Sequence, residues 1–91
     1  MEEKLLKIIN HYGYKNQLKK LSEECYELIE SIIDGELLEL DNKAIEHITE
    51  EIADVMVLLE QFKNYYDISS EEITKIFWSK VDRQLGRIEN E

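Results

Sequence analysis

The stretch EEIADVMVLLEQF, Glu50–Phe62, decides how the rest of the chain is interpreted. Every residue from Ile52 to Leu59 is apolar except Asp54, so a helix formed by this stretch is apolar around most of its circumference. A helix of that kind is buried on most sides. An unpaired carboxylate is costly in such a setting, and Asp54 therefore requires a partner that offsets its charge.

The composition indicates one small all-α domain. The chain has 91 residues, no proline and three glycines. Leu, Ile, Glu and Lys dominate, and these are mostly good helix formers. A chain of this length has room for one small hydrophobic core and not for two. We therefore predict a single all-α domain over residues 1–91.

The formal net charge is -10, which excludes several classes of partner. A surface of this charge repels nucleic acid and anionic membranes. No segment approaches the ~20 apolar residues that span a bilayer, and the N-terminal MEEKLLKIIN lacks the basic region of a signal peptide. The single Cys25 cannot form an internal disulfide. We expect a cytoplasmic protein that binds neither nucleic acid nor membrane.

Apolar residues at spacings of three and four predict two helices in the first half of the chain. The first spans about residues 2–11 and ends at HYGYKN, where a glycine lies between two tyrosines. The second spans about residues 17–33, and we expect Asp34-Gly35 to end it because glycine readily adopts the left-handed conformation that closes helices. No element is assigned to GELLELDN. The apolar stripe predicted for the second helix consists of Leu18, Leu21, Cys25, Leu28, Ile29 and Ile32.

Two capping signals predict two more helices in the second half. Asp41 or Asn42 caps a helix that runs to about residue 65. Ser69 and Glu72 form a capping box that opens a fourth helix to about residue 88. We predict a small bundle of about four helices, with two long antiparallel helices and another long helix beside them. The apolar stripe predicted for the third helix consists of Ile45, Ile48, Ile52, Val55, Met56 and Leu59.

The third helix carries more apolar surface than such a bundle can cover, because Ala53, Val57 and Leu58 lie off its main stripe. We predict that Val57, Leu58 and their neighbours contact another subunit across a two-fold axis, as in most homo-oligomers. Homo-oligomerisation as a dimer or tetramer would then complete the core. The alternative is that some of these residues stay exposed, which is common for single apolar side chains.

Two pairs of carboxylates are candidates for a metal site. Glu24 and Glu27 on the second helix, and Glu51 and Asp54 on the third, are each three residues apart and so share a helix face. If the two helices are neighbours at an axial distance of roughly 8–10 Å, both pairs meet. Four carboxylates in a partly apolar setting repel one another unless cations neutralise them. Mg²⁺ and Mn²⁺ favour carboxylate and water oxygens, so Asp54 is interpreted as a metal ligand.

A solvated acidic face is the alternative for the second helix. Glu23, Glu24, Glu27 and Glu30 lie away from its apolar stripe, as the residues of an ordinary charged surface do. Glu51 favours the metal site, because it is expected to project among apolar residues of the third helix, where a free charge is costly.

The motif EExxE, Glu23-Glu24-Cys25-Tyr26-Glu27, followed after 23 residues by Glu51-Ile52-Ala53-Asp54, resembles the MazG-like nucleotide pyrophosphohydrolases of the all-α NTP pyrophosphatase superfamily. The resemblance implies Mg²⁺-dependent hydrolysis of an NTP or dNTP to the monophosphate and pyrophosphate. It implies that Glu24, Glu27, Glu51 and Asp54 are catalytic metal ligands. It also implies that Glu23 orients the attacking water or contacts a further metal ion.

A triphosphate substrate also requires positively charged side chains. Lys80, Arg83 and Arg87 follow one another at steps of three and four on the fourth helix and form a basic strip that could bind the phosphates. Equally, these residues could form surface ion pairs, each of which stabilises little. Gln17, near the start of the second helix, is a further candidate for substrate binding.

A hypothesis of a different class also fits the sequence. In it the chain is a non-catalytic acidic helical module that oligomerises or binds a basic partner. An intermediate hypothesis keeps the metal and nucleotide site but assigns it to nucleotide sensing. The base and sugar preference, the number of metal ions and the choice between dimer and tetramer all stay open.

Overall fold

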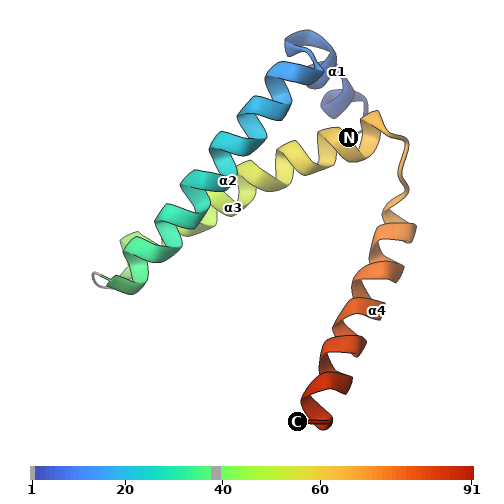
Figure 1. The fold of residues 1–91 in the computed structure, drawn as a ribbon. Helices are drawn as coiled ribbons and strands as arrows, with labels where there is room; N and C mark the ends of the chain where they lie inside the picture. The colour runs from blue at the N-terminus through green and yellow to red at the C-terminus, as the bar shows by residue number, and fades with distance from the viewer. Residues whose placement is uncertain (1, 38–39) are drawn as a thin grey trace.

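The structure is a computed structural model that describes residues 2–37 and 40–91. Within these residues the chain forms four helices and no strand (Figure 1). The prediction of an all-α chain of about four helices is confirmed. The helices are α1 (Glu2–Tyr12), α2 (Tyr14–Leu37), α3 (Asn42–Tyr65) and α4 (Ser70–Glu89).

A glycine joins α1 directly to α2. Gly13 has a φ of 92°, a conformation that other residues adopt only with strain. Its N–H donates to the carbonyl of Ile9 at 2.8 Å, and its carbonyl accepts from the N–H of Gln17 at 3.0 Å. The hydrogen bonding of the two helices therefore continues through the turn, and α2 begins at Tyr14, earlier than predicted.

The predicted end of α2 is wrong, because the helix continues through Asp34-Gly35 to Leu37. Gly35 is buried, and a Cβ atom there would lie 3.1 Å from Cδ1 of Leu40 and 3.4 Å from Cδ1 of Ile48. Because it has no Cβ atom, the glycine lets α2 approach the start of α3 closely. Of the unassigned GELLELDN segment, residues 38 and 39 lie outside the described residues.

Both predicted N-cap residues accept a hydrogen bond from the first turn of their helix, and of the predicted capping box the half in which the Glu72 N–H donates to Ser69 is present. Oδ1 of Asp41 accepts from the N–H of Ala44 at 2.9 Å at the start of α3. Oγ of Ser69 accepts from the N–H of Glu72 at 3.1 Å at the start of α4. Side-chain oxygens at these positions satisfy backbone donors that the first turn leaves free, which explains why the starts of both helices could be located closely.

α2 and α3 form an antiparallel hairpin, and α1 packs on both of them where α2 begins and α3 ends (Figure 1). Within residues 2–37 and 40–91, α4 packs against no other helix, so the prediction that another long helix lies beside the hairpin is wrong. α1 already covers the end of the hairpin from which α4 departs. The radius of gyration is consequently 16.3 Å, against about 12 Å for a compact chain of this length.

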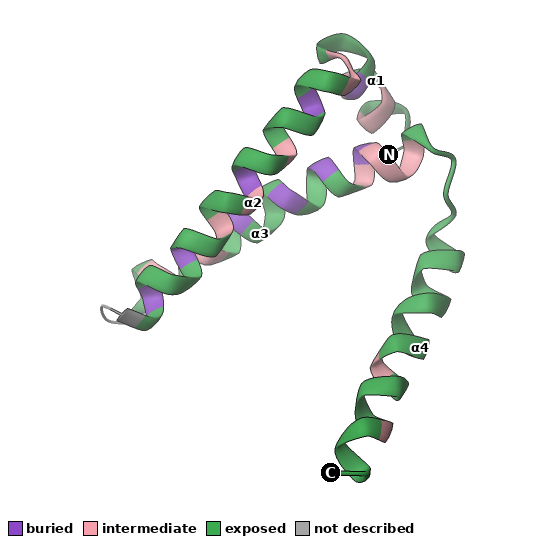
Figure 2. Ribbon diagram, in the orientation of Figure 1, coloured by how far each residue is buried: buried purple, intermediate pink, exposed green. Residues whose placement is uncertain are grey.

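The interior of this fold is unusually polar. Among the described residues only three apolar side chains are buried, those of Ile9, Val55 and Leu58 (Figure 2). The buried polar and charged residues are Gln17, Glu24, Ser31, Glu51 and Gln61, all on α2 or α3. We call these five residues the polar seam, because they follow the line along which α2 and α3 meet.

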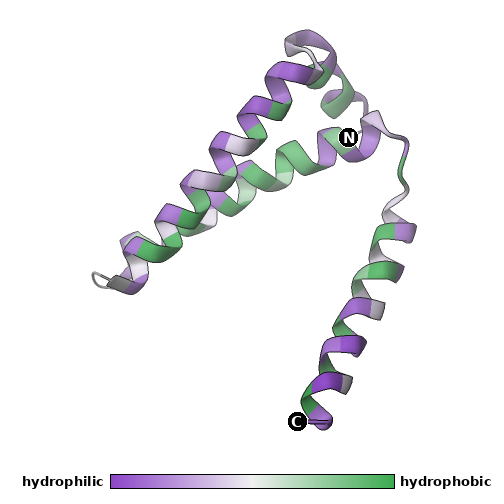
Figure 3. Ribbon diagram, viewed as in Figure 1, coloured by the Kyte–Doolittle hydropathy of each residue, from purple (hydrophilic) through white to green (hydrophobic). Residues whose placement is uncertain are grey.

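The predicted apolar stripes are therefore partly wrong. On α3, Val55 is buried as expected, but four members of the stripe are exposed. Leu58, predicted to contact another subunit, is buried at 3% exposure inside its own chain, whereas Val57 is exposed. The reason is that the polar seam occupies the face that α3 turns toward α2. The stripe residues that remain exposed are Leu18, Ile29 and Ile32 on α2 and Ile45, Ile52, Met56 and Leu59 on α3. Figure 3 shows the hydrophobic residues along these two helices.

We predict opposite effects of one substitution at two glycines. Gly13→Ala should lower the free energy of unfolding by about 1–2 kcal/mol, because alanine is strained at positive φ. Gly86→Ala should raise it by up to about 1 kcal/mol, because Gly86 lies inside α4 with open space around it. Chemical denaturation measures both, and equal effects at the two positions would contradict the assignment of Gly13 as the helix junction.

Candidate metal centre

Three carboxylates from the two long helices meet in the polar seam. One carboxylate oxygen each from Glu24, Glu51 and Asp54 lies within 4.8 Å of the others. Glu24 is 9% and Glu51 8% exposed, while Asp54 lies at the exposed edge. The antiparallel hairpin thus places the second motif residue of α2 opposite both acidic residues of the α3 motif.

Two oxygens in this group are buried without a hydrogen-bond donor. They are Oε2 of Glu24 and Oε2 of Glu51. The other oxygen of each carboxylate, Oε1, has a neighbour: Nζ of Lys20 lies 3.4 Å from Oε1 of Glu24, and Nε2 of His47 lies 3.8 Å from Oε1 of Glu51. Buried carboxylate oxygens without partners are costly. A divalent cation between them would satisfy both oxygens, so the donor set fits a hard metal ion.

Glu27 and Glu23 lie outside this closest group. The carboxylate of Glu24 raises the pKa of Glu27 above its ordinary value, with further contributions from burial and from Glu51. Glu27 is therefore within electrostatic reach of the cluster although its side chain is exposed. Glu23 is also exposed and is not among the three carboxylates that converge. Of the four predicted metal ligands, the structure brings Glu24, Glu51 and Asp54 together.

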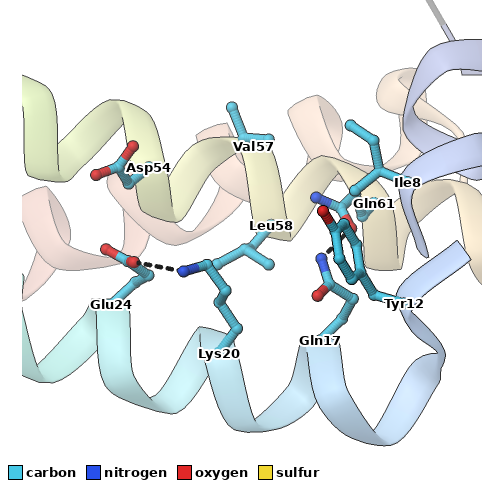
Figure 4. A pocket seen from close by; sticks show the side chains of 9 residues that line it. All are labelled: Ile8, Tyr12, Gln17, Lys20, Glu24, Asp54, Val57, Leu58 and Gln61. Atoms are coloured by element: carbon cyan, nitrogen blue, oxygen red, sulfur yellow. Dashed lines mark hydrogen bonds and ion pairs between the residues drawn. The ribbon is translucent and has the colours of Figure 1, made fainter.

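A cavity of about 550 Å³ adjoins the carboxylates (Figure 4). Glu24 and Asp54 line one end of it. At the other end, Nε2 of Gln17 donates to Oε1 of Gln61 at 2.8 Å, and both amides are buried. The predicted candidate Gln17 therefore shares a cavity with the acidic site. The remaining lining residues are Ile8, Tyr12, Lys20, Val57 and Leu58.

The basic strip predicted on α4 does not reach this cavity within one chain. Lys80 and Arg83 line a separate groove on α4 itself, and neither they nor Arg87 line the cavity beside the carboxylates. Because α4 packs on no other helix of the described chain, the strip and the acidic site lie apart within that chain.

Sequence reasoning missed two polar residues of the cavity, Lys20 and Gln61. Lys20 precedes Glu24 by four residues, a spacing that brings ammonium and carboxylate together on a helix. Gln61 continues the series Glu51, Val55, Leu58 at steps of three and four, so it shares their buried face. Both spacings are present in the sequence, but they identify cavity residues only once it is known which face of α3 is directed toward α2.

An antiparallel pair of helices with converging carboxylates defines an all-α protein with a site suited to a hard metal ion. The chain matches the family model described as the MazG nucleotide pyrophosphohydrolase domain over residues 13–85, and it belongs to this family. The predicted family resemblance is thereby confirmed. Searches of curated proteins and of solved structures returned no match. Among the described helices none is long and apolar enough to cross a membrane.

We predict that the metal-free site destabilises the fold. Glu51→Gln should raise the free energy of unfolding in EDTA by about 1 kcal/mol, because it removes a buried charge facing two other carboxylates. Mg²⁺ should stabilise the parent chain more than this variant. Thermal unfolding with and without Mg²⁺ measures both effects.

Glu50→Gln is the matched control, because Glu50 is the exposed neighbour of Glu51 and lies outside the cluster. It should leave the response to Mg²⁺ unchanged. An equal response to Mg²⁺ in the parent and in Glu51→Gln would contradict the assignment of a metal site.

Proposed function

We propose that the chain is a Mg²⁺-dependent nucleoside triphosphate pyrophosphohydrolase that converts an NTP or dNTP to the monophosphate and pyrophosphate. The observation that carries the proposal is the convergence of Glu24, Glu51 and Asp54, with two buried oxygens lacking donors, in a chain of the MazG family. Mn²⁺ is the alternative ion, because it favours the same oxygen ligands.

The carboxylates divide the chemical work between them. Glu24, Glu51 and Asp54 would hold the ion, and Glu27 would join them because it lies within their electrostatic reach. When bound, Mg²⁺ polarises the α-phosphoryl group, activates water and offsets charge on the leaving pyrophosphate. Glu23, the exposed residue that precedes Glu24 in the sequence, would orient the attacking water. The cavity beyond Glu24 and Asp54 would receive part of the nucleotide.

We further propose that the working form is a homo-oligomer, at least a dimer. The chain exposes 7783 Å², whereas a compact monomer of 10.9 kDa exposes about 5,600 Å². The difference is comparable to the surface buried in many stable oligomers. The exposed stripe Ile45, Ile52, Met56 and Leu59 of α3 and the unpacked α4 are the surfaces that a second copy would cover.

Oligomerisation also offers a role for the basic strip. Lys80, Arg83 and Arg87 of one subunit would face phosphates bound at the carboxylates of another. This arrangement pairs a strip of cations with the carboxylates at one end of the cavity, and it agrees with the observation that α4 does not pack against another helix of the described chain.

We predict Mg²⁺-dependent release of pyrophosphate from a panel of ribo- and deoxyribonucleoside triphosphates. Asp54→Asn should reduce this release at least a hundredfold, since it removes a ligand charge from the site. Glu50→Gln should retain nearly full activity. The acidic interaction module predicts no release from any nucleotide, and nucleotide binding without release would instead indicate a sensor.

We predict that Leu59→Glu dissociates the oligomer, because it places a charge in the exposed apolar stripe of α3. Lys43→Gln is the matched control: it changes the net charge of α3 equally, but at an exposed polar position. Sedimentation equilibrium should give an oligomeric mass for the control and a monomeric mass for Leu59→Glu. A monomeric parent chain would contradict the proposed assembly.

A further inference from the structure

We infer that Lys20 binds the phosphates of the nucleotide, and that Glu24 holds its ammonium group at the site until a divalent cation engages that carboxylate. The inference rests on the proposed function, because it assigns a polyphosphate contact at the same site.

Lys20 lines the cavity one helical turn before Glu24 on α2, and its ammonium is directed toward the Glu24 carboxylate (Figure 4). Its Nζ atom is 3.4 Å from Oε1 of Glu24, and its side chain is 57% exposed while that of Glu24 is 12% exposed. The ion pair therefore joins a side chain that is largely open to solvent to a carboxylate that is nearly buried. A polyphosphate approaching the carboxylates from solvent would meet this positive charge.

Among the nine residues that line the cavity, Lys20 is the only basic one. Its neighbours Lys15 and Lys19 are exposed on α2 and do not line the cavity. Lys80 and Arg83 line a different groove. A triphosphate carries several negative charges into a space bordered by Glu24 and Asp54, and in the described chain Lys20 is the side chain placed to offset them there.

The ion pair with Glu24 is suited to exchange. An exposed lysine pairs weakly with a carboxylate, and its flexible four-carbon stem lets the ammonium reorient at little cost. A divalent cation bound at Oε2 of Glu24 would offset the charge of the same carboxylate whose Oε1 holds Lys20, and it would repel the ammonium. Lys20 would then be released from Glu24 at the moment when a phosphate partner is present.

If this exchange occurs, removing the Lys20 side chain should change the affinities for Mg²⁺ and for polyphosphate in opposite directions. Without the ammonium, Glu24 is free of a competitor, so Mg²⁺ alone should bind more tightly. The phosphate contact is lost, so polyphosphate should bind more weakly. A residue with only a structural role on α2 would weaken both or change neither.

The test is calorimetric titration of Lys20→Met, with Lys19→Met as the matched control, because Lys19 is adjacent, exposed and outside the cavity. Mg²⁺ alone should bind about threefold more tightly to Lys20→Met, as expected for loss of an exposed ion pair. Inorganic tripolyphosphate in the presence of Mg²⁺ should bind about tenfold more weakly, as expected for loss of a charged hydrogen bond. Lys19→Met should change neither affinity, and Lys20→Arg should restore tripolyphosphate binding.

Unchanged tripolyphosphate affinity in Lys20→Met, or parallel losses for both ligands, would overturn the inference, as would a parent chain that binds no tripolyphosphate. Binding needs no hydrolysis, so the two proposals fail separately. If the parent chain binds tripolyphosphate through Lys20 but releases no pyrophosphate from any nucleotide, only the proposed hydrolysis fails. If hydrolysis is found and Lys20→Met binds as the parent does, only the role of Lys20 fails.

Discussion

The polar seam between α2 and α3 is the constraint on which the rest of the structure depends. It places Glu24 and Glu51 in the interior of a chain that buries only three apolar side chains among its described residues. Burying charge in this way destabilises the fold unless a cation and other contacts offset the cost. The seam therefore links two features of the described chain: the fit to a divalent cation and the apolar surface left outside, which is the surface we propose a second copy covers.

Local signals in the sequence predicted the helices well. Caps at Asp41 and Ser69 fixed two helix starts, because one side-chain oxygen satisfies a backbone donor regardless of tertiary context. The end of α2 could not be predicted in this way. A glycine near a helix end serves equally as a terminator or as a site of close approach, and Gly35 is the second because Leu40 and Ile48 lie against it.

The candidate site was predicted in part because local residue spacings, like the helix caps, can be read from the sequence without knowledge of the tertiary structure. The spacings within each motif placed Glu24, Glu51 and Asp54 on helix faces, and the hairpin turned those faces together. Spacing alone could not identify which face of α3 its own chain would cover. Two neighbouring faces satisfy steps of three and four, one through Val55 and Leu58 and one through Met56 and Leu59. Lys20 and Gln61 become visible as cavity residues only after that choice is made.

A crystal structure of the chain grown with Mn²⁺, with anomalous scattering used to locate the ion, would show whether the polar seam holds a divalent cation. We expect a strong anomalous peak within bonding distance of Glu24, Glu51 and Asp54, with Oε2 of Glu24 or Glu51 among the ligands. Peaks confined to other acidic residues, with Glu24, Glu51 and Asp54 unliganded, would contradict this assignment.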